Sequence, residues 1–141
     1  MHRQPWFHTL VSLIGAIALL AMASALDRFL AARLKFAQAS FEYNQLFLAQ
    51  IVVGLLVFIG WFALGWYVLF SRHPSRGLNI ALLILGAFVV WAPYAGIWAG
   101  LPIMQVGLYE LTTDLVHATG IYIAVLGGLG LLYKPRKLDQ A

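Results

Sequence analysis

The chain has 141 residues, of which 62% are hydrophobic and only 10% are charged, and its formal net charge is +4. A soluble globular domain has about 25% charged residues, so this composition excludes an ordinary soluble domain and indicates an integral membrane protein. Cysteine is absent, which excludes disulfides, thiolate metal sites and a cysteine nucleophile. The cations lie at segment ends and not in a basic run with interleaved aromatic residues, so we expect no nucleic-acid partner.

Four stretches of the chain are free of charged residues over the length that a helix needs to cross a hydrocarbon core, about 20 residues. The polar segment SRHPSRGLN and the segment around Pro102 predict tight turns between antiparallel neighbours. We interpret residues 1–141 as a single transmembrane domain, an all-α integral membrane protein built as an antiparallel four-helix transmembrane bundle. Its spans are expected at 6–26, 46–70, 79–99 and 113–133.

The first span has an alternative interpretation as a secretory signal peptide. Residues 10–22 have the length of its apolar region, and Ala23-Ser24-Ala25 matches the pattern of small residues that precedes a cleavage site. Against cleavage, apolar sequence already begins at Trp6, which gives a full spanning length. We therefore favour an uncleaved helix. Cleavage would leave three spans with an N-terminus on the outside and the orientation of the other spans unchanged.

The connection between the first two spans is predicted to stay helical, because no Gly or Pro occurs from residue 16 to residue 53. Over residues 27–38, apolar side chains share one helical face and polar side chains the opposite face, which predicts an amphipathic extension of the first helix. Pro102 is suited to open the fourth helix before its apolar part begins. We therefore expect helices that project beyond the bilayer on the outer side by about 10 residues, or roughly 15 Å.

The cations predict how the chain is oriented. If the N-terminus is cytoplasmic, six of the nine Lys and Arg residues lie on the inner side and three, Arg28, Arg33 and Lys35, on the outer side. Cytoplasmic segments of membrane proteins carry the excess of Lys and Arg. We expect a multi-pass protein of the cell membrane with both termini cytoplasmic.

A cluster of polar residues is predicted near the outer boundary. Glu110, Asp114 and His117 are separated by four and three residues, so they share one face of a helix. The last two spans carry no Lys or Arg between them, so a cation that pairs with these carboxylates comes from another helix or another chain. Arg33 lies on the apolar face of the extension, where an unpaired guanidinium is costly. We expect Arg33 to point inward toward Glu110, Asp114 or Glu42.

Glu110, Asp114 and His117 are also weak candidates for a metal site. Carboxylates and an imidazole suit a divalent metal, and a di-metal bundle site takes a carboxylate-x-x-His motif from each of two helices. Asp114 and His117 supply one such motif and the chain has no second, so we expect no metal and no cofactor. His117 alone offers one axial ligand to a haem or a chlorophyll. We favour a His117 that is hydrogen-bonded to Gln50 or Tyr94, and a Gln50 that bridges helices.

Small residues predict where the helices pack, because they let two backbones approach closely in a membrane. The predicted packing rows are Ala92, Gly96 and Gly100 in the third span and Gly120, Ala124 and Gly128 in the fourth.

The sequence contains no catalytic constellation: there is no Ser-His-Asp arrangement, no Gly-rich phosphate loop and no His-Glu-x-x-His motif. We therefore expect a protein without enzymatic activity that acts by helix association, as an accessory subunit of a membrane complex or as a self-associating bundle. Its expected partners are the lipid bilayer and either other membrane protein chains or copies of itself. The alternatives are an oligomeric transporter or channel component and, less favoured, metal or pigment binding through His117.

Overall fold

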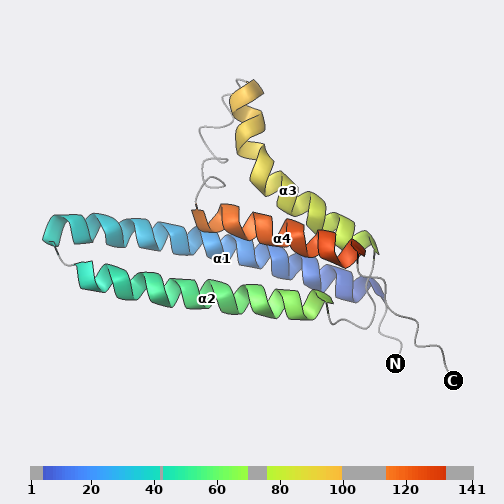
Figure 1. Cartoon of the computed structure of the whole chain (residues 1–141), viewed down its shortest axis with the longest axis horizontal. Helices are drawn as coiled ribbons and strands as arrows, with labels where there is room; N and C mark the ends of the chain where they lie inside the picture. Colours follow the sequence, from blue (N-terminus) through green and yellow to red (C-terminus); the bar gives the residue numbers. More distant parts are fainter. Residues whose placement is uncertain (1–4, 42, 70–75, 100–113, 133–141) are drawn as a thin grey trace.

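Four long helices make up the part of the chain that the structure, a computed structural model, describes: residues 5–41, 43–69, 76–99 and 114–132 (Figure 1). The helices are α1 (Pro5–Ser40), α2 (Tyr43–Leu69), α3 (Arg76–Ala99) and α4 (Asp114–Leu132). Each of them contains a segment that is long and apolar enough to cross a membrane. The prediction of an all-α chain with four potential membrane-spanning helices is therefore confirmed.

The first helix, α1, is continuous over 36 residues, so the chain stays helical well beyond the first predicted span. It ends at Ser40, and α2 begins at Tyr43. Phe41 forms the turn with a φ of 58°, in the left-handed region where glycine is the usual residue after a helix. That conformation costs a non-glycine residue about 1–2 kcal/mol. The Phe41 side chain is 82% exposed, so packing within the described chain does not compensate for this cost.

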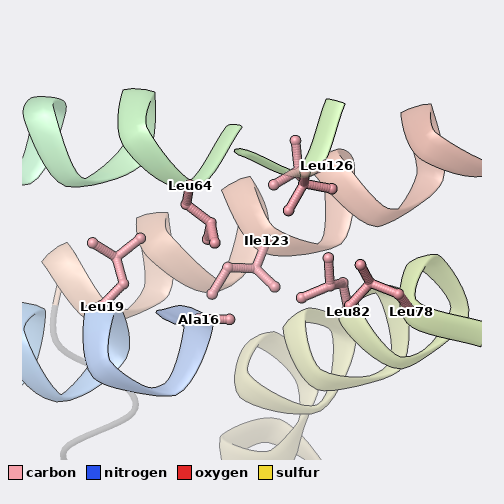
Figure 2. Packing of buried hydrophobic residues seen from close by; sticks show 8 residues of the cluster. Ala16, Leu19, Leu64, Leu78, Leu82, Ile123 and Leu126 are labelled. Carbon is pink, nitrogen blue, oxygen red and sulfur yellow. The ribbon is translucent and has the colours of Figure 1, made fainter. Parts of the chain in front are cut away.

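The apolar core lies where α1, α2, α3 and α4 meet, and Figure 2 shows side chains from all four helices gathered there. A second, smaller cluster joins Ala23 of α1, Val89 of α3 and Val116 of α4. Ala23, which belongs to the predicted cleavage pattern, is only 1% exposed in the middle of α1. The main cluster consists of Ala16, Leu19, Leu64, Val68, Leu78, Leu82, Ile123 and Leu126.

The helices α3 and α4 approach each other so closely that glycine is needed at the contact. A Cβ atom on Gly127 would lie 2.6 Å from the carbonyl oxygen of Asn79 and from the amide nitrogen of Leu83. A Cβ atom on Gly86 would lie 2.5 Å from the carbonyl oxygen of Gly120. Gly127, late in α4, thus faces Asn79, early in α3, and Gly120, earlier in α4, faces Gly86, later in α3. The two helices therefore run in opposite directions.

The predicted packing rows coincide only in part with this interface. Gly120 and Ala124 lie in it, since a Cβ atom on Gly86 would touch both. Gly128 does not take part in this contact, because no other part of the described chain lies within 4 Å of a Cβ atom built there, and its place in a packing row stays a prediction. The row turns to Gly127 instead, since a helix has 3.6 residues per turn and not four. On α3, Ala92 is half-buried, and the surroundings of the predicted Gly96 and Gly100 lie outside the described residues.

Toward its end α3 leaves the other helices, whereas α1, α2 and α4 lie side by side (Figure 1). Pro93 stands inside α3. Proline lacks the N–H that the helical ladder needs and its ring collides with the preceding turn, so it bends a helix. Pro93 therefore gives a local cause for the divergence.

The helices α1 and α2 continue together past the start of α4 (Figure 1). We call residues 28–41 and 43–52 the α1–α2 tip. Within the tip only Ala37 and Leu46 are buried. The apolar face predicted for the extension of α1 is therefore mostly uncovered, and Phe29, Leu34 and Phe36 on it are exposed.

The adjacent residues Gly127 and Gly128 give a matched test of the α3–α4 contact. We expect Gly127→Ala to lower the free energy of unfolding by about 1–3 kcal/mol, the usual cost of overpacking, because backbone atoms of α3 cannot move aside as a side chain does. Gly128→Ala should leave stability unchanged or slightly raised, since its surroundings are open and alanine favours a helix. Unfolding of both variants in mild detergent with increasing denaturing detergent measures the difference. Equal stabilities would show that the close approach is wrong.

Candidate functional site

A group of hydrogen bonds and a stacked ring pair join α2 to α4. The indole Nε1 of Trp61 donates a hydrogen bond to Thr119 Oγ1 at 3.2 Å, and Thr119 Oγ1 donates to the carbonyl oxygen of Leu115 at 2.7 Å. The Tyr122 hydroxyl donates to the carbonyl oxygen of Trp61. The Trp61 and Tyr122 rings are stacked, with centroids 5.0 Å apart and planes inclined by 6°. Because hydrocarbon offers polar groups no water, these bonds favour one specific pairing of the two helices.

A carboxylate from α1 caps the first turn of α4. The backbone N–H of Leu115 donates a hydrogen bond to Asp27 Oδ2 at 3.1 Å. The first N–H groups of a helix have no partner within it, and the positive end of its dipole favours an anion. Asp27 therefore accepts a hydrogen bond from an N–H group of α4 that lies 88 residues later in the sequence. This bond fixes the position of α4 along the axis of α1.

A third polar contact joins α1 and α2 at the opposite end of the structure. His8 Nδ1 and the Tyr67 hydroxyl are 3.0 Å apart and hydrogen-bonded. Their rings lie 6.1 Å apart. Together with the contacts of Trp61 and Asp27, this bond ties α1, α2 and α4 to one another near both ends.

The predicted outer polar cluster is only partly within the described residues, since Glu42 and Glu110 lie outside them. Arg33 is exposed, and its guanidinium carbon lies 5.2 Å from the centre of the Phe29 ring. Within the four described ranges, Arg33 forms no ion pair with Asp114, so the expected inward position toward that residue is not observed. Pairing of Arg33 with Glu42 or Glu110 stays a prediction.

The two remaining members of the cluster, Asp114 and His117, lie in the first turns of α4. Asp114 is exposed, and His117 is half-buried with its ring 6.2 Å from the Tyr94 ring in an edge-on contact. Tyr94 is thus a neighbour of His117, as expected, but the observed contact is between the two rings. Gln50, the other expected partner, is exposed on α2.

The candidate metal site cannot be assembled from the described part of the chain alone. The structure contains no group of three or more His, Asp or Glu side chains close enough to share a metal ion in the ranges 5–41, 43–69, 76–99 and 114–132. Glu110, the third proposed ligand beside Asp114 and His117, lies outside these ranges. In the described ranges, the structure therefore supports the metal hypothesis only in placing Asp114 and His117 on the same helix, α4.

An apolar groove of about 350 Å³ lies between α1 and α2. At one end it reaches Tyr67, whose hydroxyl contacts His8. Both helices contribute small residues to the lining, Gly15 and Ala18 from α1 and Gly60 and Ala63 from α2. The groove therefore lies close to the two backbones. The lining consists of Val11, Gly15, Ala18, Leu19, Met22, Gly60, Ala63, Leu64 and Tyr67.

No protein-family model matches this chain, and comparison with curated proteins and with solved structures likewise gives no match. Support for a function therefore comes from the chain's own residues. The hydrogen bonds described above join neighbouring helices, and the groove is an apolar surface between α1 and α2 that the described helices leave open.

The Asp27 cap is tested by substitution of its carboxylate. We expect Asp27→Ala to lower the free energy of unfolding by about 0.5–2 kcal/mol, as for other lost N-caps, whereas Asp27→Asn keeps a side-chain oxygen and most of the stability. Hydrogen exchange at the Leu115 amide should accelerate in the alanine variant. Unchanged exchange and unchanged stability in Asp27→Ala would contradict the cap.

Proposed function

We propose that the protein acts by helix association within a membrane, as an accessory subunit of a membrane complex or as a self-associating bundle. The observation that carries this proposal is the open groove between α1 and α2, with Gly15 and Ala18 on one side and Gly60 and Ala63 on the other. Lipid tails are as apolar as the side chains of a helix, so helices associate in membranes by close packing and hydrogen bonds. A surface of small residues suits such packing.

The contacts inside the chain support this use of small residues. The helices α3 and α4 meet through Gly86, Gly120 and Gly127, with backbone against backbone. In the groove, Gly15 and Gly60 lie against side chains of the facing helix, whereas Ala18 and Ala63 are exposed and offer the small-residue surface that the described helices leave uncovered. A transmembrane helix from another copy or another chain is the occupant we propose for it.

The proposed arrangement in the membrane is an antiparallel four-helix bundle in the cell membrane, with both termini cytoplasmic and the α1–α2 tip beyond the hydrocarbon core on the outer side. The excess of cations at the opposite end supports this orientation. The 19 residues of α4 span about 28 Å at 1.5 Å per residue, which matches a hydrocarbon core of about 30 Å.

The alternative of a transporter or channel component would gain support from charged side chains that line an interior cavity. In the described residues the α1–α2 groove is apolar, and α2 carries no charged residue. Charges in the other helices occur at Asp27, Arg28, Arg33, Lys35, Arg76 and Asp114. This distribution favours association over transport.

Association through the groove is tested with Ala18→Phe, which places a large ring in the groove, and with Ile17→Phe as a control on an exposed neighbouring position of α1. Two differently tagged copies, expressed together, are purified through one tag. We expect Ala18→Phe to weaken recovery of the second copy, or of another membrane chain, by about tenfold, equivalent to about 1.4 kcal/mol. Recovery with Ile17→Phe should match the wild type.

Equal recovery of all partners by both variants, with equal thermal stability, would overturn the groove as an association surface. Loss of the second copy identifies a self-associating bundle. Loss of a different chain with the second copy unaffected identifies an accessory subunit.

The topology is tested with reporters at both ends of the chain. We expect an N-terminal and a C-terminal reporter to be active on the cytoplasmic side only. The N-terminal tag should remain attached to a full-length product in an immunoblot, because α1 continues through Ala23-Ser24-Ala25. Reporters on different sides of the membrane, or loss of the N-terminal tag by cleavage, would contradict this topology.

A further inference from the structure

The α1–α2 tip rises higher than the headgroup layer of a membrane reaches. Asp27 caps the first turn of α4, so Asp27 and Asp114 lie at one level, and charged residues of this kind belong outside the hydrocarbon core. Ser40 lies 13 positions after Asp27 on the same helix, or about 20 Å above it at 1.5 Å per residue. A headgroup layer adds only about 5–8 Å on each side of the core. More than half of the tip therefore projects beyond the lipid.

The projecting part of the tip has an apolar surface that is unsuited to water. Its side chains Phe36, Phe41, Tyr43 and Phe47 are each more than half exposed. Large apolar residues that are exposed together mark contact with another molecule. Because lipid does not reach this height, we expect that molecule to be a protein.

The exposed apolar positions of α1 repeat with the period of a coiled coil. In the α1–α2 groove, α1 positions from Val11 to Met22 alternate by four and three residues, and the same alternation continues to the end of the helix. From Ala25 onward, every position of the repeat is exposed. A seven-residue apolar repeat is the seam along which one helix packs against another. Leu34, which is also exposed, projects about 160° away from Ala32, so it lies outside this repeat. We call the repeat the α1 seam: Val11, Gly15, Ala18, Met22, Ala25, Phe29, Ala32, Phe36 and Ala39.

Two exposed cations flank the seam within the tip. Arg33 follows Ala32 in the sequence, and Lys35 precedes Phe36. A rotation of about 100° per residue places the two cations on opposite sides of the seam. They lie about 9 and 12 Å above Asp27 at 1.5 Å per residue, which is above the headgroup layer. Charges in these positions of a coiled coil pair with charges of the partner helix and determine which partner binds. The seam therefore fits a helix with acidic flanks.

The same cations disfavour a second copy as the partner. Two copies that share one topology lie parallel, so Arg33 of one copy would face Arg28 of the other, five positions earlier on the opposite flank. Like charges placed opposite each other select against that pairing. Arg28 takes part in an interaction within its own chain, so we count only Arg33 and Lys35 as available to a partner. Residues 28–52 contain three cations and one acid, Glu42, so a different chain supplies acidic flanks better than a second copy does.

We propose that the α1 seam binds a helix of a different membrane protein, with Asp or Glu side chains on both flanks of its own apolar seam beyond the hydrocarbon core. Within the membrane this helix lies in the α1–α2 groove, and above the membrane its carboxylates pair with Arg33 and Lys35. The inference rests on the proposed association through the groove and names its partner. It selects the accessory subunit over the self-associating bundle.

The charge of the partner is tested with two designed transmembrane helices, each co-expressed with the full chain. They are identical within the hydrocarbon and in an apolar seam that extends beyond it, and both flanks of the extension carry only Glu in one helix and only Gln in the other. We expect the purified chain to recover the Glu helix about tenfold better than the Gln helix, since only carboxylates form ion pairs with Arg33 and Lys35. The double variant Arg33→Glu/Lys35→Glu should reverse this preference. Gln38→Glu, which adds an acid to the tip about 160° away from Phe36, should keep it.

Equal recovery of the two helices by the wild type, or an unchanged preference in the double variant, would overturn the acidic partner. Ala18→Phe should lower the recovery of both helices alike and leave their ratio unchanged, because Ala18 lies about 14 Å below Asp27. An unchanged total recovery in Ala18→Phe counts against the groove, whereas a ratio near one in the wild type counts against the seam. The failure of the proposed function and the failure of this inference are therefore distinguishable.

The occupant of the seam in native membranes is identified with a photo-crosslinking amino acid in place of Ala32 on the seam or, as a control, of Ala31 beside it, both exposed. We expect the label at Ala32, and not the label at Ala31, to crosslink to a different chain, with Asp or Glu within about one helical turn of the attachment point. This adduct should be lost in Arg33→Glu/Lys35→Glu. An adduct with a second tagged copy, with lipid alone or with residues 100–113 of the same chain would overturn the proposal.

Discussion

Hydrocarbon contains no water to bind an unpaired polar group, and this constraint accounts for most of what the structure shows. It requires each span to be a helix, in which backbone groups bond to one another. It also gives a few polar side chains a strong influence on which helices become neighbours. Trp61, Thr119 and Tyr122 satisfy one another between α2 and α4, and Asp27 satisfies the first turn of α4. Apolar packing around Ile123 and Leu82 then fills the space between helices that these bonds have already paired.

The sequence predicts the helices well because the relevant signals are local. Long runs without charge and the lack of Gly or Pro after Gly15 in α1 are read directly from neighbouring residues. The contacts between helices are less predictable. Asp27 and Leu115 are 88 positions apart, and nothing in the spacing of either segment relates one to the other. The helical face of Arg33 predicted that its side chain points inward. Arg33 is exposed, however, because only Ala37 and Leu46 are buried in the α1–α2 tip.

The small residues show the same limit at finer scale. Gly120 and Ala124 were placed at an interface from their spacing, and they do pack against α3. The choice between Gly127 and Gly128 depends on the accumulated rotation of α4. Residues four apart differ by about 40° around a helix, so a strict row of three drifts by about 80°, nearly the roughly 100° that separates neighbouring residues. The divergence of α3 near Pro93 was likewise not predicted, because the pattern of apolar residues gives the length of a helix and not its direction.

The last helix contacts all of the others: α4 bonds to α1 through Asp27, to α2 through Trp61, and packs on α3 through glycine. Chains are synthesised from the N-terminus, so α1, α2 and α3 leave the ribosome before α4 exists. During that interval the indole of Trp61 and the carboxylate of Asp27 lack their native partners. Assembly of the native core therefore waits until α4 has entered the membrane and docks onto the three helices that precede it.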